Sequence, residues 1–282
     1  MLSIVCGLGA AVAWATSTLC ASRASRLISI GSLVAWVTTV GMLVAGPAVA
    51  IVGIPPSLDA GVAGWLVVSG AGNVIGLLLG YSALRIGKVG LVAPITSTEG
   101  AVAALLAVIA GERLSPAVGA TLGVIAIGVA LAATAPAASE PARRANIRAG
   151  LLAAAAAVSF GLGIYATGRV SNAIGIAWAV MPPRLFGVVA IAVPLAFTSR
   201  LRMTRRALPL VITAGLGEVA GYASYAIGAR HSLAVSAVLG SQFAAIATFV
   251  GFLLFRERLG RFQIAGVAAI IAGVSALAVL HG

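Results

Sequence analysis

The chain consists almost entirely of apolar segments of about 20 residues, the length with which a helix crosses the hydrocarbon core of a bilayer. Short basic turns separate these segments. Only 9% of the residues are charged, whereas 61% are hydrophobic, so a water-soluble fold could not cover its surface with polar groups. The pattern predicts an all-α integral membrane protein, and no segment is left for a soluble domain.

Ten membrane-spanning helices are expected, five on each side of a polar stretch. The first five are Leu2–Ala21, Ile30–Gly53, Gly61–Leu84, Val89–Ala110 and Pro116–Thr134. The second five are Ala149–Thr167, Ile174–Phe197, Leu208–Ile227, Ser232–Phe255 and Leu259–Leu280. The expected organisation is therefore a five-helix repeat over residues 1–134, a connecting loop over 135–148 and a second five-helix repeat over 149–282.

The two halves carry the same markers about 145 residues apart, which indicates an internal duplication. The most specific marker is Glu112-Arg113-Leu114, which recurs as Glu257-Arg258-Leu259. Gly70, Gly72 and Gly76 recur as Gly215, Gly217 and Gly221, and Gly128-Val129 recurs as Gly273-Val274. Because five is an odd number of spans, the second copy must enter the membrane from the opposite side, which predicts an inverted repeat.

The basic residues fall mainly in the odd-numbered turns between helices. The odd turns hold Arg23, Arg26, Arg85, Lys88, Arg143, Arg144, Arg148, Arg200, Arg202, Arg205, Arg206, Arg256, Arg258 and Arg261, and the even turns hold Arg113, Arg169 and Arg230. By the positive-inside rule we expect the odd turns to be cytoplasmic and both termini to lie outside. This distribution explains the net charge of +12 by membrane orientation, and no nucleic-acid partner is expected.

No cofactor, metal or disulfide is expected from the remaining chemistry. Cys6 and Cys20 stand about 21 Å apart along one helix and cannot pair with each other. Neither metal-ligand spacing nor a nucleotide-binding motif occurs. The first apolar segment is expected to stay in the protein, because no basic region precedes it as in a signal peptide.

Two matching sequence stretches carry a family resemblance. They are Gly111-Glu112-Arg113-Leu114 followed by Gly123 and Gly128-Val129, and Arg256-Glu257-Arg258-Leu259 followed by Gly266 and Gly273-Val274. Both stretches resemble the repeated end of EamA-type permeases in the drug/metabolite transporter superfamily, and Trp14, Phe160 and Arg184 suit the same pattern. The resemblance implies ten helices around a central cavity and, often, export of amino acids, metabolites or toxic compounds. Some relatives have cytosolic termini, opposite to the orientation expected from the charges.

Three ionisable side chains fall near the middle of a predicted span: Glu99, Arg184 and Glu218. A charge at the bilayer centre costs from about 2.5 to more than 10 kcal/mol, so these groups should face a watery cavity, pair with one another or, in the case of the two carboxylates, stay protonated. A structural ion pair of Arg184 with Glu218 or Glu99 is one interpretation. A role in transport is the other.

Glu218 is the first candidate for proton exchange. Tyr222 and Tyr225 follow it on the same helical face, and Asn73 occupies the matching position in the first copy. Arg184 follows two prolines that favour an irregular helix, and its guanidinium could bind a substrate carboxylate in a forked contact.

Further polar and aromatic groups are candidates for the walls of a midplane cavity. They are the hydrogen-bonding residues Thr96, Ser97, Thr98, Ser236, Ser241 and Gln242, more than half of which are expected only to bond to neighbouring helices, and the aromatic residues Trp14, Tyr165, Trp178 and Phe243, which either line the cavity or lie at the membrane interface. Gly72, Gly76, Gly217 and Gly221 are interpreted as helix-packing positions rather than as a dinucleotide-binding motif.

These features predict a secondary transporter that works by alternating access and exports a small metabolite, amino acid or amphipathic drug. Its expected location is the bacterial inner membrane, and its expected partners are membrane lipid, the solute and, if transport is coupled, protons. Proton coupling and facilitated exchange both stay open, as do a monomer and a homodimer. The alternatives are an integral-membrane enzyme acting on a lipid or polyprenyl substrate and a noncatalytic assembly subunit.

Overall fold

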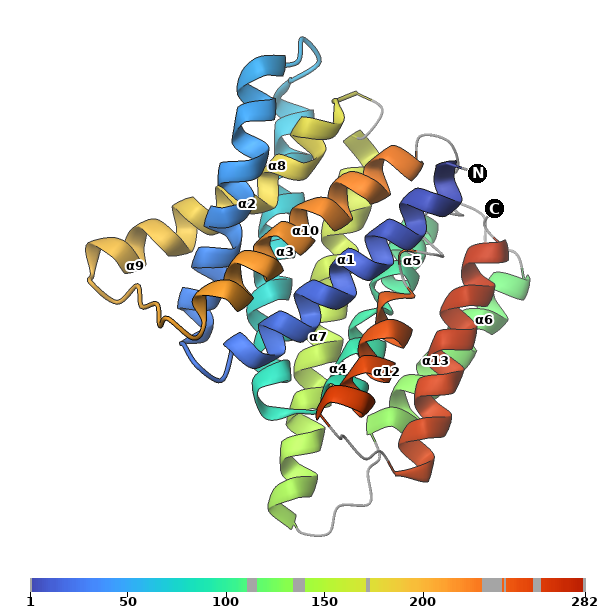
Figure 1. Ribbon diagram of the computed structural model, residues 1–282. Helices are drawn as coiled ribbons and strands as arrows, with labels where there is room; N and C mark the ends of the chain where they lie inside the picture. The colour runs from blue at the N-terminus through green and yellow to red at the C-terminus, as the bar shows by residue number, and fades with distance from the viewer. Residues whose placement is uncertain are drawn as a thin grey trace.

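The computed structural model describes residues 2–110, 116–133, 140–170, 173–229, 240, 242–255 and 260–280. All regular elements of these residues are helices (Figure 1). Within the described ranges, six spans are long and apolar enough to cross a membrane: Ile4–Ala24, Ile30–Val52, Ala60–Ile86, Ala142–Thr167, Ile176–Phe197 and Leu208–Gly228. The prediction of an all-helical, multi-pass membrane protein is confirmed.

The first three helices begin and end close to their predicted limits. They are α1 (Leu2–Ala24), α2 (Ile30–Val52) and α3 (Ala60–Ile86). Ser29 and Asp59 cap α2 and α3, and the Asp59 carboxylate accepts a hydrogen bond of 2.7 Å from the backbone N–H of Val62. Such caps satisfy backbone donors that a helix leaves free at its first turn.

The predicted helix Val89–Ala110 is two helices in the structure, α4 (Val89–Thr96) and α5 (Glu99–Ile109). The prediction of one continuous span is therefore wrong at residues 97 and 98. Pro94 lacks a backbone donor, and the hydroxyl groups of Ser97 and Thr98 donate to carbonyl groups three residues earlier, at 2.8 and 2.7 Å. Local bonds of this kind compete with the regular helix ladder and end the helix here.

The sixth predicted span begins earlier than expected. Helix α7 runs from Glu140 to Val170, so residues 140–148, predicted as part of the connecting loop, are its first turns. This stretch is rich in alanine and arginine, which are strong helix formers, and the charged turns extend the helix beyond its apolar part.

The remaining helices include one irregular span. Helix α8 (Ile176–Gly187) continues through the π-helical segment η1 (Val188–Ala192) into α9 (Val193–Phe197). Two consecutive prolines, Pro182 and Pro183, lie inside α8 and remove two backbone donors just before the π-helical turn. The others are α6 (Pro116–Ala133), α10 (Leu208–Ala229), α12 (Phe243–Phe255) and α13 (Arg261–Leu280). The predicted start of the ninth span, at Ser232, lies outside the described residues.

The helices pack in three close pairs. Helix α1 lies along α10, α3 lies along α7, and α6 lies along α13 (Figure 1). A Cβ atom at Gly72 would lie 2.8 Å from the backbone oxygen of Ser159, and one at Gly217 would lie 2.7 Å from that of Ala13. These two glycines therefore stand where the backbones of α3 and α7, and of α1 and α10, approach most closely.

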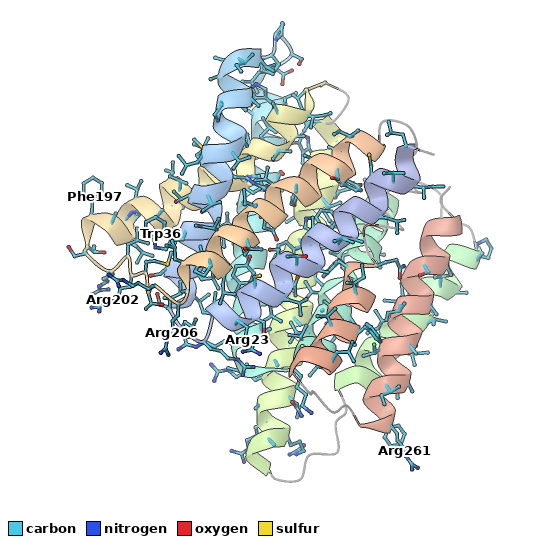
Figure 2. The ribbon with its side chains drawn as sticks, viewed as in Figure 1. Arg23, Trp36, Phe197, Arg202, Arg206 and Arg261 are labelled. Atoms are coloured by element: carbon cyan, nitrogen blue, oxygen red, sulfur yellow. The ribbon has the colours of Figure 1, made fainter. Side chains whose placement is uncertain are left out.

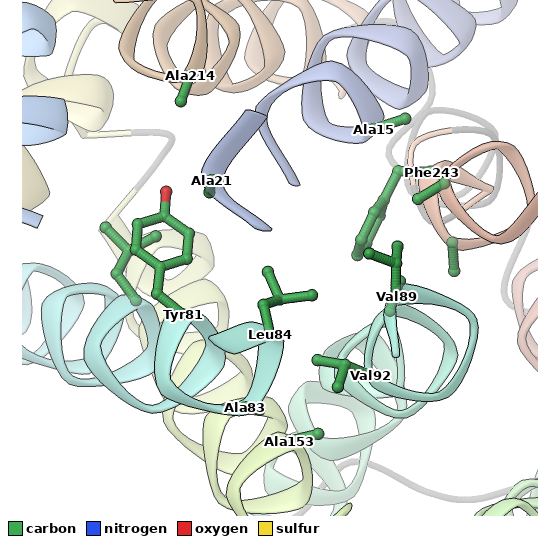
Figure 3. Packing of buried hydrophobic residues seen from close by; sticks show 14 of the residues in the cluster. Ala15, Ala21, Tyr81, Ala83, Leu84, Val89, Val92, Ala153, Ala214 and Phe243 are labelled. Atoms are coloured by element: carbon green, nitrogen blue, oxygen red, sulfur yellow. The ribbon is translucent and has the colours of Figure 1, made fainter. Parts of the chain in front are cut away.

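The main apolar core lies between α1, α2, α3, α4, α7, α10 and α12, with single contributions from α5, α6 and α13. Figure 3 shows Leu84, Val89, Val92 and Phe243 filling it, with small alanines around them. In the same view the ring of Tyr81 reaches from α3 between Ala21 and Ala214.

Basic residues gather on one side of the molecule. Arg23, Arg202, Arg206 and Arg261 lie at the side away from the labelled N- and C-termini, as comparison of Figures 1 and 2 shows. All four belong to the odd-numbered turns of the sequence prediction.

Candidate functional site

Glu218 lies on α10 and is bound by a serine from α1. The Ser17 hydroxyl donates a hydrogen bond of 3.0 Å to Oε1 of Glu218, and Ser17 itself is fully buried. The preceding residue, Gly217, makes this contact possible. A Cβ atom at this position would lie only 3.2 Å from Cβ of Ser17 and would crowd it. A small residue at 217 thus lets α10 approach α1 closely enough for a serine to reach the carboxylate.

Tyr81 adds a second hydroxyl to the surroundings of Glu218. Its ring is buried, and its hydroxyl lies beside Ser17 and within electrostatic range of the Glu218 carboxylate. The hydroxyl has no hydrogen-bond partner among the described residues. A buried hydroxyl without a partner is costly, so a water molecule or a bound solute would gain free energy by pairing with it.

Arg184 lies on α8 with only 3% of its surface exposed. Its Nη1 donates to the Val180 carbonyl at 3.1 Å, and its Cζ lies 4.8 Å from the centroid of the Tyr222 ring. Within the described chain, Nη2 has no hydrogen-bond partner, and neither Glu218 nor Glu99 forms an ion pair with the guanidinium. The charge is therefore held by a carbonyl and a ring face, and one donor pair remains available.

Tyr222 connects α10 with α3. Its hydroxyl accepts a hydrogen bond of 2.6 Å from Nδ2 of Asn73, which is 3% exposed. The same ring covers the Arg184 guanidinium. Tyr222 is thus fixed at both its hydroxyl and its face.

Trp14 is the centre of an aromatic cluster on the other side of Tyr222. Its ring centroid lies 5.7 Å from that of Tyr222, 6.0 Å from that of Tyr225 and 6.4 Å from that of Phe243. Gly221 faces the Trp14 ring, and any side chain at this position would collide with it. The cluster gives the site an apolar wall next to its charged groups.

Glu99 is the first residue of α5, directly after the break that follows α4. Its carboxylate is close enough for its charge to act on Glu218, Tyr222 and Tyr225. The helix break, which the sequence did not predict, therefore places a second acidic group near the same region.

Several other candidates lie outside this cluster. Gln242 donates at 2.6 Å to the Ser275 hydroxyl and thereby connects α12 with α13. Trp178 donates at 2.7 Å to the Gly53 carbonyl at the end of α2, and Tyr165 stacks edge-on with Trp65. The hydroxyl groups of Thr96, Ser97 and Thr98 donate to carbonyls of their own segment. Ser236 and Ser241 lie outside the described residues.

Ser17 and Tyr81 were missed by the sequence interpretation. Neither carries a charge, and a serine or tyrosine in an apolar span is usually bonded within its own helix or placed at the interface. The available signal was the small residue at 217, which repeats at 72 and marks a close approach between helices.

Comparison with known proteins supports the membrane interpretation. The sequence of residues 1–134 matches the EamA-like transporter family. This part of the chain is similar to members of that family. The EamA-like family is part of the drug/metabolite transporter superfamily, so the resemblance expected from the sequence is confirmed over these residues.

A similarity of fold covers nearly the whole chain. One solved crystal structure of a protein shares the fold with a TM-score of 0.66 at 17% identity, over 99% of this chain and 98% of the other. No curated protein matches the sequence significantly.

Proposed function

We propose that the chain is a secondary transporter that moves a small solute by alternating access. The observation that carries this proposal is the cluster of Glu218, Arg184 and Tyr81, which come from three different helices; Arg184 and Tyr81 are buried, and Glu218 is half-buried. Among the described residues, Tyr81 and Arg184 each keep a polar atom without a partner. Unpaired polar atoms next to a buried charge are expected where water or a solute passes, since hydrocarbon would not tolerate them.

The architecture that we propose consists of two inverted five-helix repeats, residues 1–134 and 149–282. Paired glycine contacts support it. Gly76 faces Phe160, and Gly221, which stands 145 residues later, faces Trp14, which stands 146 residues before Phe160. Four further pairs of contacts are related in the same way. Gly72 faces Ser159 and Gly163, and its counterpart Gly217 faces Ala13 and Ser17; Gly70 faces Pro182, and its counterpart Gly215 faces Val37. Gly187 faces Thr38, and Gly41 faces Arg184; Gly128 faces Ile270, and Gly273 faces Ile125. Such reciprocity is expected from two copies related by a pseudo-two-fold axis.

Glu218 is the proposed coupling group. When ionised, the carboxylate accepts the Ser17 hydrogen bond and can accept a second one from the Tyr81 hydroxyl after a small movement. When protonated, it gains a donor and loses an acceptor site, so the contacts among α1, α3 and α10 must change. A proton can therefore bias which arrangement of these helices is favoured.

Arg184 and the aromatic cluster are the proposed solute contacts. Nη2 of Arg184 would bind an anionic group of the solute, such as a carboxylate, and the rings of Trp14 and Tyr225 would contact its apolar part. This combination fits an amino acid, a small metabolite or an amphipathic drug. Export across a bacterial inner membrane, implied by the family resemblance, is the direction that we propose.

Reconstitution tests the proposal. Purified protein in liposomes should release or accumulate a carboxylate-bearing solute when a pH gradient is applied, and the flux should collapse when a protonophore removes the gradient. Formation of a chemical product without net flux would instead support an enzyme acting on lipid. A solute flux that is the same with and without a pH gradient would show facilitated transport. It would also contradict a coupling role for Glu218.

A further inference from the structure

The segment between α9 and α10, residues 198–207, is named here the arginine loop. It contains four arginines, Arg200, Arg202, Arg205 and Arg206, and all four are exposed. No acidic residue occurs from position 196 to position 217. The loop therefore carries a local positive charge that its own stretch of chain does not neutralise.

The backbone of the arginine loop is fixed against α2. The Arg202 N–H donates to the Ser32 hydroxyl at 3.1 Å, the Ser32 hydroxyl donates to the Arg200 carbonyl at 3.4 Å, and Nε1 of Trp36 donates to the Arg202 carbonyl at 3.3 Å. Met203 turns inward and packs on the apolar core, whereas Arg202 before it is exposed. This alternation holds the guanidinium groups on the outer face of the loop.

The arginine loop also lies next to an exposed apolar side chain. Phe197, the last residue of α9, is 86% exposed and directly precedes the loop. Figure 2 shows Phe197, Trp36, Arg202 and Arg206 along the same edge of the molecule. An exposed aromatic ring beside arginines at the end of a membrane span is typical of the boundary between hydrocarbon and lipid headgroups.

We propose that the arginine loop binds the headgroups of anionic phospholipids in the adjacent leaflet. A guanidinium presents paired N–H donors that match two phosphate oxygens, and clusters of basic residues next to a membrane span attract anionic lipid. The lipid that we propose at the loop is phosphatidylglycerol, because its headgroup carries a net negative charge. Phosphatidylcholine presents the same phosphate with a compensating ammonium group and should bind more weakly.

Trp36 offers a local reporter for the test. Full-length protein is reconstituted into phosphatidylcholine vesicles that contain brominated phosphatidylglycerol, and quenching of tryptophan fluorescence is measured. The contribution of Trp36 is obtained by difference from a Trp36→Phe variant. The reverse mixture, with bromine on phosphatidylcholine, gives the relative affinity for the two lipids.

The informative variant is Arg202→Gln with Arg206→Gln, and the matched control is Arg148→Gln with Arg261→Gln. The control removes two exposed arginines that lie outside the loop, one on α7 and one on α13. The loop variant should lose preference for phosphatidylglycerol by about fivefold for each arginine removed, and the control should keep it. An Arg202→Lys variant keeps the positive charge but loses the paired N–H donors of the guanidinium. Its preference for phosphatidylglycerol should lie between that of the loop variant and that of the control.

Equal quenching by both lipids in the unaltered protein would overturn the proposal. A loss of preference as large in the control as in the loop variant would also overturn it, because net charge rather than the loop would then select the lipid. If the double loop variant does not fold, the single Arg202→Lys variant decides: unchanged preference would contradict binding through the fork.

Discussion

Ser17 of α1 and Glu218 of α10 are joined by a hydrogen bond of 3.0 Å, although 201 positions separate them in the sequence. The bond depends on the close approach of the two helices at Gly217. Since Tyr81 of α3 lies beside the same pair, three helices meet at one carboxylate. A change in the protonation of Glu218 would therefore alter the contacts among α1, α3 and α10 together.

Tyr222→Phe should destabilise the protein, whereas Tyr81→Phe should not. The Tyr222 hydroxyl accepts a bond from the buried Asn73, so its removal should cost about 1 to 3 kcal/mol. The Tyr81 hydroxyl has no partner in the described part of the chain, so its removal should be neutral or slightly stabilising. Unfolding in mixed detergent micelles measures both. A Tyr81→Phe variant that is as destabilised as Tyr222→Phe would show that Tyr81 is a structural donor.

A second readout tests whether Tyr81 acts through Glu218. Tyr81→Phe should move the midpoint of the pH profile of transport upward, because the ionised Glu218 carboxylate loses a nearby hydroxyl that could donate a hydrogen bond to it. The matched control is Tyr165→Phe, which alters a ring near Trp65 on α3, away from Glu218. An unchanged midpoint in Tyr81→Phe would remove Tyr81 from the coupling.

Arg184→Lys should separate solutes by charge. Loss of the forked contact should weaken transport of anionic and zwitterionic solutes about tenfold or more, and cationic solutes should be affected much less. Competition by a panel of charged analogues in liposomes measures the difference. An equal loss for every solute would indicate that Arg184 stabilises the fold through Val180 and Tyr222 rather than binding solute.

Gly217→Ala tests the close approach of α1 and α10. The added methyl group would lie 2.7 Å from the Ala13 backbone oxygen, which cannot move without shifting the helix. A loss of about 1 to 3 kcal/mol in unfolding free energy is expected, together with weakened transport. Gly64→Ala on α3 is the control, because nothing lies within 4 Å of its added Cβ, and alanine should there be neutral or stabilising by up to about 1 kcal/mol. Equal stability of the two variants would contradict the account.

The sequence predicted most of the spans, because hydrophobic length is a property of one segment at a time. It also placed Tyr222 on the same helix face as Glu218, since helical periodicity needs no knowledge of partners. The break between α4 and α5 was missed because it depends on Ser97 and Thr98 bonding to their own backbone, a choice that a hydropathy pattern does not record. The helical start of α7 was missed because its turns are charged.

The candidate site could be predicted only in part. Charged residues in apolar spans stand out, so Glu99, Arg184 and Glu218 were found, whereas Ser17 and Tyr81 become visible only when α1, α3 and α10 are placed side by side. Gln242 was expected to supply a hydrogen-bonding group near the midplane, either to a cavity or to a neighbouring helix, and in the structure its amide connects α12 with α13 through Ser275. Partners of this kind depend on tertiary packing, which neither composition nor spacing determines.

Proton-driven flux through Glu218→Gln protein in liposomes tests the central claim most directly. Glutamine keeps the shape of the side chain and can still accept the Ser17 hydrogen bond, so folding and solute binding should persist. The account predicts that the variant loses concentrative transport driven by a pH gradient while solute exchange between equal compartments continues. Concentrative transport at the rate of the unaltered protein, with the same pH profile, would contradict it.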